Sequence, residues 1–121
     1  MVLDLATGTG DVALLIAKQT KEKSKIIAAV DPSKNMIEIA QKKSIERNMT
    51  KKIYFELGNA MDMNNMKDSV YTKVSMSFGI RNIPDRMKAL KEIRRVMVKR
   101  KYNYNESTQN HCNHLFRPHL R

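Results

Sequence analysis

A short apolar segment that runs directly into a glycine turn constrains the fold of this chain more than any other feature. Residues 2–5 read Val-Leu-Asp-Leu, and the turn that follows contains Gly8 and Gly10. A second apolar segment, 26–30, comes one predicted helix later and ends at Asp31. Strand, glycine turn, helix and a strand that ends in a carboxylate form the first half of a nucleotide-binding α/β unit.

Each part of this unit has a physical reason. Gly8 and Gly10 allow a sharp backbone turn and leave no Cβ between the chain and a ligand. The helix predicted to begin near Asp11 directs unpaired N–H groups towards the same space. Asp31, at the carboxyl end of its strand, can accept hydrogen bonds from both hydroxyls of a ribose. The pattern therefore predicts a site for a ligand that contains a nucleoside.

The turn alone leaves the ligand open. The spacing Gly8-x-Gly10-x-x-Ala13 also satisfies the dinucleotide fingerprint, and glycine is common in any strand–turn–helix crossover. Asp4 favours a different ligand, because a carboxylate near the end of the first strand would repel a pyrophosphate and would suit an ammonium group. S-adenosylmethionine carries an adenosine ribose, an amino acid and no phosphate.

The rest of the chain continues the alternation of strands and helices. Hydrophobic spacing and turn residues predict helices over 11–20, from a cap at Ser33 to about Arg47, and over 84–98, strands over 53–57 and 73–78, and a loop over 61–69. This order predicts an α/β fold, a parallel sheet flanked by helices and joined by right-handed crossovers. All the motifs then meet at the carboxyl edge of the sheet, where ligands bind such folds.

Four segments give the chain a resemblance to a known family. They are 2–11, 30–36, 58–60 and 77–83, the last reading Ser-Phe-Gly-Ile-Arg-Asn-Ile. Together they resemble the class I S-adenosylmethionine-dependent methyltransferases, which have a Rossmann-like fold. More narrowly, they resemble the C-methyltransferases of ubiquinone and menaquinone biosynthesis, for which the 77–82 hexapeptide is the specific mark. The resemblance extends from Met1 to about Lys99.

The resemblance implies S-adenosylmethionine as the cofactor and assigns it a set of residues. Thr9 matches a position that contacts the methionine end, and Asp31 matches the ribose carboxylate. Asn59 and Ala60 match the pair that lines the adenine. Ser77 matches a position beneath the reacting centre. Asp4, Gly8 and Gly10 complete the predicted cofactor site.

Two further residues each have two possible functions. Met36, one helical turn past Asp31, is expected to pack on the adenine or to be an ordinary core methionine. Arg81 is expected to stabilise a phenolate on the substrate or to bond loop carbonyls as a structural residue. The chain also departs from the commonest methyltransferase pattern at Ala6, where a glycine is usual, and at Asn59, where an aspartate is usual. Both departures resemble the quinone branch, and Ala6 leaves the turn intact if its φ is negative.

The implied reaction is methyl transfer to a ring carbon of a prenylated hydroquinone, either 2-polyprenyl-6-methoxy-1,4-benzoquinol or demethylmenaquinol. Such a substrate implies peripheral membrane contact and a quinone-biosynthesis complex as partners. The implied location is the matrix side of the mitochondrial inner membrane in a eukaryote and the cytoplasm in a bacterium. Two alternatives are a nicotinamide-dependent oxidoreductase and a non-catalytic fragment or interaction subunit, since the C-terminal strands of the family are lacking.

The composition of the chain limits the classes of partner that it is expected to bind. The chain of 121 residues has a formal net charge of +11, yet only 6% of its residues are aromatic. Its lysines are scattered over predicted helices and are not interleaved with aromatic residues, so no nucleic acid is expected. Weak attraction to acidic phospholipids is compatible with this charge. No apolar run is long enough for a membrane helix, and the start at a core strand predicts neither a signal nor a transit peptide.

The last part of the chain differs from the rest. Residues 1–98 are predicted to form a partial S-adenosylmethionine-binding domain, and residues 99–121 a basic, polar, disordered tail. His111, Cys112 and His114 invite a metal interpretation, but ligands crowded so closely rarely close a tetrahedral site, so no metal is predicted. The single cysteine excludes an internal disulfide. Without a further strand, the strand over 73–78 is expected to be an exposed sheet edge.

Overall fold

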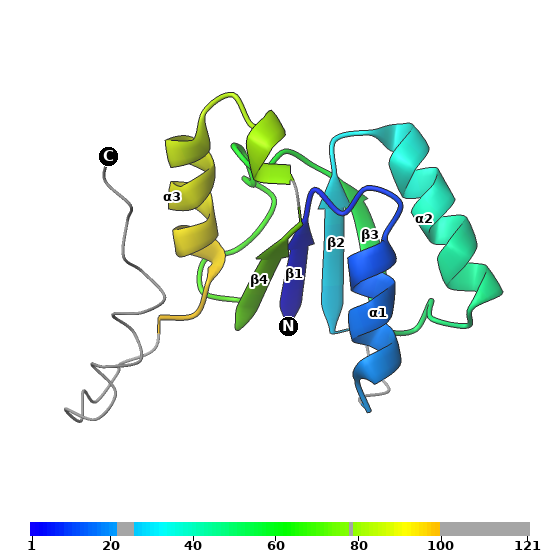
Figure 1. Cartoon of the computed structure of the whole chain (residues 1–121). Coiled ribbons are helices and arrows are strands. Elements are labelled where there is room, and N and C mark those ends of the chain that lie inside the picture. The colour runs from blue at the N-terminus through cyan, green and yellow to red at the C-terminus, as the bar shows by residue number, and fades with distance from the viewer. Residues whose placement is uncertain (22–25, 78, 100–121) are drawn as a thin grey trace, which may run out of the picture.

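The computed structural model describes residues 1–21, 26–77 and 79–99. The predicted strands and helices are all present, in the predicted order (Figure 1). They are β1 (Val2–Leu5), α1 (Asp11–Gln19), β2 (Ile27–Asp31), α2 (Lys34–Glu46), β3 (Ile53–Leu57), β4 (Lys73–Met76), a 3₁₀ turn η1 (Gly79–Asn82) and α3 (Arg86–Val96). The predicted tail from residue 100 onwards, with its three histidines, lies outside the described residues.

Several boundaries differ from the prediction by one or two residues, and the start of α3 has a clear local cause. Helix α3 begins at Arg86 because the carboxylate of Asp85 accepts the N–H of Lys88 at 3.1 Å and so caps the helix. The 3₁₀ turn η1 occupies residues that were not assigned to any element. The predicted cap of α2 is confirmed, since Ser33 Oγ accepts the N–H of Met36 at 3.4 Å.

The strands form one parallel sheet in the order β3-β2-β1-β4. Asp4 on β1 lies between Ala29 on β2 and Ser75 on β4, which sets the register. Parallel strands bring all four carboxyl ends to one edge, the upper edge in Figure 1. The predicted Rossmann-like α/β fold is confirmed. Within the described residues, β4 pairs with β1 alone, as the prediction of an open edge requires.

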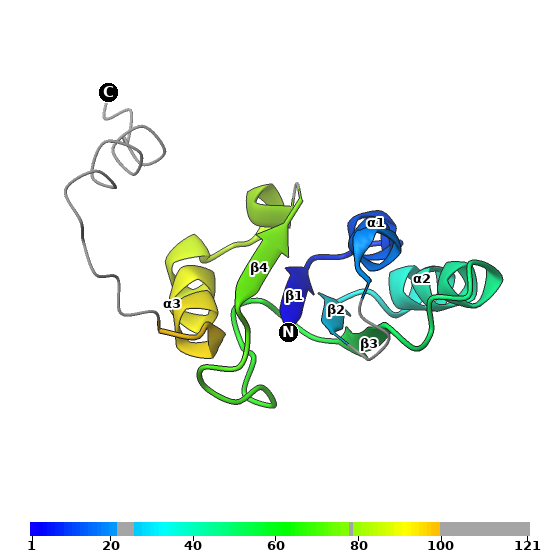
Figure 2. The same ribbon diagram turned by 90° about the horizontal axis from the view of Figure 1, so that it is seen from below.

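Each face of the sheet is covered. Helices α1 and α2 lie on one side, while α3 and the connection between β3 and β4 lie towards the other (Figure 2). Successive residues of β2 alternate between the two faces, as expected of a strand buried on both sides. The core on the α1 side is built from Ala13, Leu14, Ala17, Ile27, Ala29 and Ile53.

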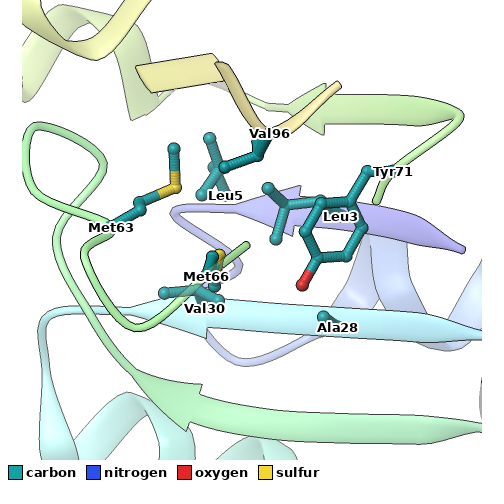
Figure 3. Close-up of a cluster of buried hydrophobic side chains, with 8 residues drawn as sticks. All are labelled: Leu3, Leu5, Ala28, Val30, Met63, Met66, Tyr71 and Val96. Carbon is teal, nitrogen blue, oxygen red and sulfur yellow. The ribbon is translucent and has the colours of Figure 1, made fainter. Parts of the chain in front are cut away.

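The core on the opposite face draws on the β3–β4 connection (Figure 3). Met63 and Met66 are 1% and 8% exposed and pack with strand and helix residues. The sequence predicted the loop but not this burial, because the methionines of the loop follow no period. The cluster consists of Leu3, Leu5, Ala28, Val30, Met63, Met66, Tyr71 and Val96. None of the helices in the described ranges is both long enough and apolar enough to cross a bilayer.

Candidate functional site

A cavity of ≈ 540 Å³ lies at the carboxyl edge of the sheet. Its volume falls in the range of about 300–1,000 Å³ that small-molecule sites occupy. The turn after β1, the end of β2, the segment after β3 and the region of η1 all contribute to its walls. The lining residues are Leu5, Ala6, Gly8, Val30, Asp31, Pro32, Ser33, Met36, Gly58, Asn59, Ala60, Met61, Gly79, Asn82, Ile83 and Pro84.

Asp31 is the acidic residue of this cavity, and its two oxygens are bound in different directions. Oδ2 accepts the N–H of Gly8 at 2.9 Å, and Oδ1 accepts the N–H of Ser33 at 2.9 Å. The residue is only 8% exposed. A carboxylate offers about four lone-pair sites, so each oxygen can still accept a second hydrogen bond. Asp31 therefore links the glycine turn to the start of α2 and keeps the capacity to bind a pair of hydroxyls.

The two glycines of the turn have different functions. Gly8 has a φ of +56° and lines the cavity, and a Cβ added to it would meet nothing within 4 Å. Gly10 has a φ of +83°, and its Cβ would lie 3.0 Å from that of Ala40 and 3.3 Å from Phe55. Gly10 thus lets α1 approach α2 and β3, while Gly8 leaves space at the cavity.

The φ angle of Ala6 does not meet the condition stated from the sequence. Its φ is +51°, not negative, so a residue with a Cβ occupies the left-handed region that glycine favours. The backbone after β4 passes close beside it, and a Cβ on Gly79 would collide with the Cβ of Ala6. Gly79 is therefore required by its contact with the first turn.

Thr9, which the resemblance places at the methionine end of the cofactor, does not line the cavity. Its hydroxyl accepts a hydrogen bond from Lys43 Nζ at 3.0 Å, and the same ammonium contacts Asp11 at 2.6 Å. The hydrogen bond from Lys43 and its charge lower the pKa of Asp11. Thr9 therefore helps to join α1 to α2. The residue of the turn that lies beside Asp31 at the cavity is Gly8.

Asp4 is likewise removed from the cavity. It is 1% exposed, and it accepts hydrogen bonds from the hydroxyl of Thr7 at 2.7 Å and from that of Ser75 at 2.6 Å. The carboxylate thus ties the first turn to β4. Thr7 and Ser75 were not singled out from the sequence, because their function depends on the pairing of β1 with β4.

The residues expected around an adenine do meet. Met36, Asn59 and Ala60 all line the cavity. Met36 is 41% exposed, so the alternative of an ordinary core methionine is wrong. Asn59 Oδ1 accepts the N–H of Met61 at 2.9 Å, which leaves the side-chain NH₂ group as a donor.

The segment after β4 differs in detail from the expectation. Ser77 and Arg81 are exposed and do not line the cavity, whereas Asn82, Ile83 and Pro84 do. Phe78 lies outside the described residues. Within the hexapeptide 77–82 that carries the resemblance, the described residues that line the cavity are Gly79 and Asn82, not Ser77 or Arg81.

Metal ligands do not gather in the described part of the chain. Among those residues, no group of three His, Cys, Asp or Glu side chains could hold an ion. The group of His111, Cys112 and His114 lies outside the described ranges.

Comparison with known sequences identifies the family. Residues 1–107 match the ubiE/COQ5 methyltransferase family. The chain is 40% identical over 98 residues to the ubiquinone/menaquinone biosynthesis C-methyltransferase UbiE of Rickettsia prowazekii (strain Madrid E), covering 79% of this chain and 39% of that protein. It is 38% identical over 96 residues to the demethylmenaquinone methyltransferase of Lactiplantibacillus plantarum, covering 79% of this chain and 40% of that protein. The chain thus spans about 40% of the length of these curated relatives.

Solved structures share the fold. YcgJ of Bacillus subtilis superposes with a TM-score of 0.72 at 26% identity, covering 81% of this chain and 39% of that one. A SAM-dependent methyltransferase of Aquifex aeolicus superposes with a TM-score of 0.71 at 24% identity, covering 80% of this chain and 50% of that one.

Proposed function

Since the chain belongs to the ubiE/COQ5 methyltransferase family, we propose that it provides the S-adenosylmethionine-binding part of a C-methyltransferase of quinone biosynthesis. The observation that carries the proposal is the arrangement at Asp31. A buried carboxylate oriented by Gly8 and Ser33 opens onto a cavity of suitable size. Its free lone pairs match the two hydroxyls of an adenosine ribose.

The other cavity residues fit the rest of the nucleoside. The thioether of Met36 would pack on the adenine ring, a contact that polarisable sulfur favours. The amide of Asn59 would donate a hydrogen bond to the ring edge. Gly8 would let the backbone approach the cofactor closely, because a Cβ there would point into open space.

When bound, S-adenosylmethionine supplies an electrophilic methyl group on a sulfonium, which needs no metal. The cavity walls would exclude water and hold the substrate carbon near this methyl group. The apolar lining residues Ile83, Pro84 and Met61 suit a prenylated aromatic ring. Arg81, on the exposed turn after β4, would stabilise a phenolate of the substrate as a fixed cation.

The proposed acceptor is a prenylated hydroquinone, and the printed names of the relatives cover both a ubiquinone/menaquinone enzyme and a demethylmenaquinone enzyme. We therefore propose 2-polyprenyl-6-methoxy-1,4-benzoquinol or demethylmenaquinol. Membrane contact, a quinone-biosynthesis complex and the predicted compartments follow from such a lipid substrate and belong to the same proposal.

A calorimetric titration with S-adenosylhomocysteine tests the cofactor site. We expect micromolar binding to the wild-type chain and a loss of about 10- to 100-fold in Asp31→Asn, because charge-assisted hydrogen bonds contribute about 1.5–3 kcal/mol. Asp11→Asn is the matched control, since Asp11 follows the same turn but lies outside the cavity. Its affinity should stay within about threefold of wild type.

A titration with NADH in the same buffer separates the methyltransferase from the nicotinamide-dependent oxidoreductase. Tighter binding of NADH than of S-adenosylhomocysteine would contradict the proposal. Folded protein that binds neither ligand would also contradict it, and circular dichroism establishes the folded state.

A second candidate is a cofactor-binding module without turnover. It is favoured by the exposed positions of Ser77 and Arg81 outside the cavity. Transfer of a labelled methyl group to demethylmenaquinol distinguishes the two. In a catalytic chain, Arg81→Ala lowers turnover and leaves the affinity for S-adenosylhomocysteine nearly unchanged, whereas equal losses indicate a structural arginine.

A further inference from the structure

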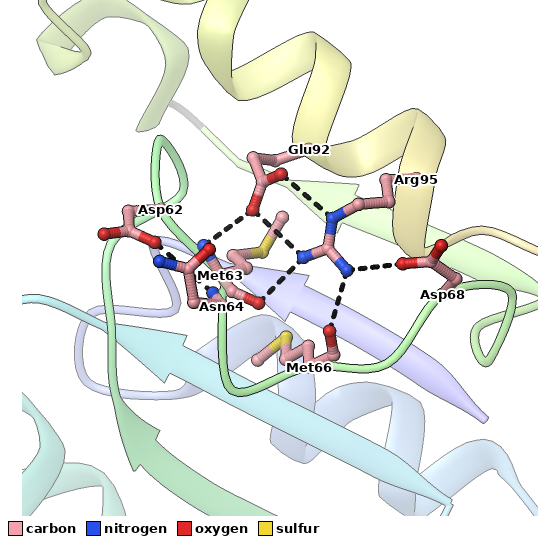
Figure 4. Close-up of polar contacts among 7 residues, drawn as sticks. All are labelled: Asp62, Met63, Asn64, Met66, Asp68, Glu92 and Arg95. Carbon is pink, nitrogen blue, oxygen red and sulfur yellow. Dashed lines mark hydrogen bonds and ion pairs between the residues drawn. The ribbon is translucent and has the colours of Figure 1, made fainter.

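Arg95 on α3 uses all of its hydrogen-bond donors in one place (Figure 4). Nε and one terminal nitrogen donate to the carboxylate of Glu92 at 3.0 and 3.1 Å. The other donors reach the carbonyls of Met63 and Met66, both at 2.8 Å, and the carboxylate of Asp68 at 2.7 Å. A guanidinium has five N–H donors in a fixed fork, so this group is saturated.

The target of this group is the connection between β3 and β4. Met63 is bound at both of its backbone groups: its carbonyl accepts from Arg95, and its N–H donates to Glu92 Oε2 at 2.7 Å. The side chain of Met63 is 1% exposed in the core below. We call Arg95 and Glu92 the α3 clamp. The guanidinium of Arg95 is not fully removed from water, because its side chain remains 30% exposed.

The clamp holds the segment next to the cavity. Residues 58–61 line the cavity in succession, and Met63 follows after a single intervening residue. That residue, Asp62, donates its N–H to the carbonyl of Asn59 at 3.0 Å. At the other end, Gly58 donates its N–H to the carbonyl of Asp31 at 3.1 Å. The turn that carries Asn59 is therefore anchored on one side by β2 and on the other by the α3 clamp.

We infer that Arg95 and Glu92 are positioning residues for recognition of the nucleobase. They touch no cavity atom themselves, and they act by setting where Asn59 and Ala60 stand relative to Asp31. This inference rests on the proposed function, because it concerns the adenine end of the same site. An amide that reads a ring edge must be placed to within a fraction of an ångström, and such placement comes from the groups behind it.

A positioning function and a merely structural function predict different results. A structural contact, when lost, lowers the stability of the fold and weakens every nucleoside ligand by the same factor. A positioning contact, when lost, changes the discrimination between bases. The ratio of the affinities for S-adenosylhomocysteine and S-inosylhomocysteine measures this discrimination, because the two differ only at one edge of the base. There, the 6-amino group and the N1 acceptor of adenine become a carbonyl and an N1–H in hypoxanthine.

The test compares Arg95→Lys with Arg94→Lys. Lysine keeps the charge but cannot reproduce the fork, so Arg95→Lys should reduce the affinity ratio by about fivefold or more. Arg94 is the adjacent residue on the same helix and is exposed, so Arg94→Lys should leave the ratio within about twofold. An unchanged ratio in Arg95→Lys would overturn the inference while the proposed function stands. Wild-type protein that binds neither compound would overturn both.

Glu92→Gln provides a milder variant should Arg95→Lys fail to fold. The amide oxygen of the substituted side chain can still accept the N–H of Met63, but the charge that pairs with Arg95 is lost. Hydrogen exchange of the amides over 58–62 then reports the anchoring without any ligand. The inference requires faster exchange there than in wild type, and equal exchange rates would contradict it.

Discussion

The two walls of the cavity are held by different means. The wall formed by the glycine turn is set by its own backbone: Ala6, Gly8 and Gly10 all have positive φ, and Gly8 bonds to Asp31. The wall formed by residues 58–61 contains a turn at Asn59 and bonds to β2 through Gly58. It is also anchored through Met63 by Arg95, which is 32 residues away in the chain. The comparison teaches that the first wall takes its shape mainly from unusual backbone conformations, whereas the second also depends on the side chains of a distant helix.

The largest expected effect comes from crowding the first wall. Gly79→Ala would place a methyl group against the Cβ of Ala6, where neither backbone can move freely, and should destabilise the fold by about 3 kcal/mol. Gly8→Ala is the matched control, because its Cβ meets open space and only the left-handed φ costs about 1 kcal/mol. Urea unfolding measures both. Equal losses would show that steric contact with Ala6 is not the cause.

Breaking the second wall should have the next largest effect. Glu92→Ala removes the acceptor of the buried Met63 N–H and a partner of Arg95, which should cost about 2 kcal/mol. Glu38→Ala on α2 removes an exposed glutamate from a helix and should change the free energy of unfolding by less than about 0.5 kcal/mol. If the two variants unfold at the same urea concentration, the α3 clamp contributes nothing to stability.

A smaller effect of opposite sign is expected at Ala6. Ala6→Gly relieves the cost of a left-handed alanine, about 1–2 kcal/mol, and adds entropy to the unfolded chain. The net result should be a stabilisation of about 0.5–1 kcal/mol. The same change should recover part of the loss in Gly79→Ala, since it removes the colliding Cβ. Additive effects in the double variant would contradict the contact.

The smallest effect is a pH dependence of the second wall alone. The hydrogen bond from Arg95 lowers the pKa of Glu92 below its ordinary value of 4.5. The clamp therefore contributes its full stability above about pH 4.5 and loses it as the pH falls through the lowered pKa. The difference in unfolding free energy between wild type and Glu92→Gln should be constant from about pH 7 to about pH 5 and shrink below about pH 4.5. A difference that grows on acidification would reverse this assignment.

The predictions from sequence do not divide along the line between the two walls. The elements, the parallel sheet and the carboxyl-edge site followed from apolar runs, the glycine turn and Asp31, because these signals are local. Met36 and Asn59 also reached the cavity as expected. Asn59 comes shortly after β3, and Met36 lies in the first turn of the helix that follows β2. At these points the topology of the sheet alone fixes the position of a residue.

Thr9 and Asp4, two predicted cofactor residues, do not line the cavity and bond elsewhere in the fold. Thr9 bonds to Lys43, and Asp4 bonds to Ser75, although both stand in the motif. Lys43 and Ser75 are far from these residues in sequence, so no local pattern indicated these two bonds, although Thr7, the second partner of Asp4, is only three positions away. The positive φ of Ala6 and the close approach of Gly79 to it are likewise properties of the folded turn.

The pairing of Asp4 with Ser75 also has a consequence for how the chain folds. These residues are 71 positions apart, so β1 leaves the ribosome long before its second neighbour exists. Contacts between such distant segments form slowly, because the closure of a long loop precedes any gain from pairing. During synthesis, the nascent chain therefore carries Asp31 and the glycine turn well before β4 can pair with β1. The bond between Asp4 and Ser75 secures the first turn only after that late pairing.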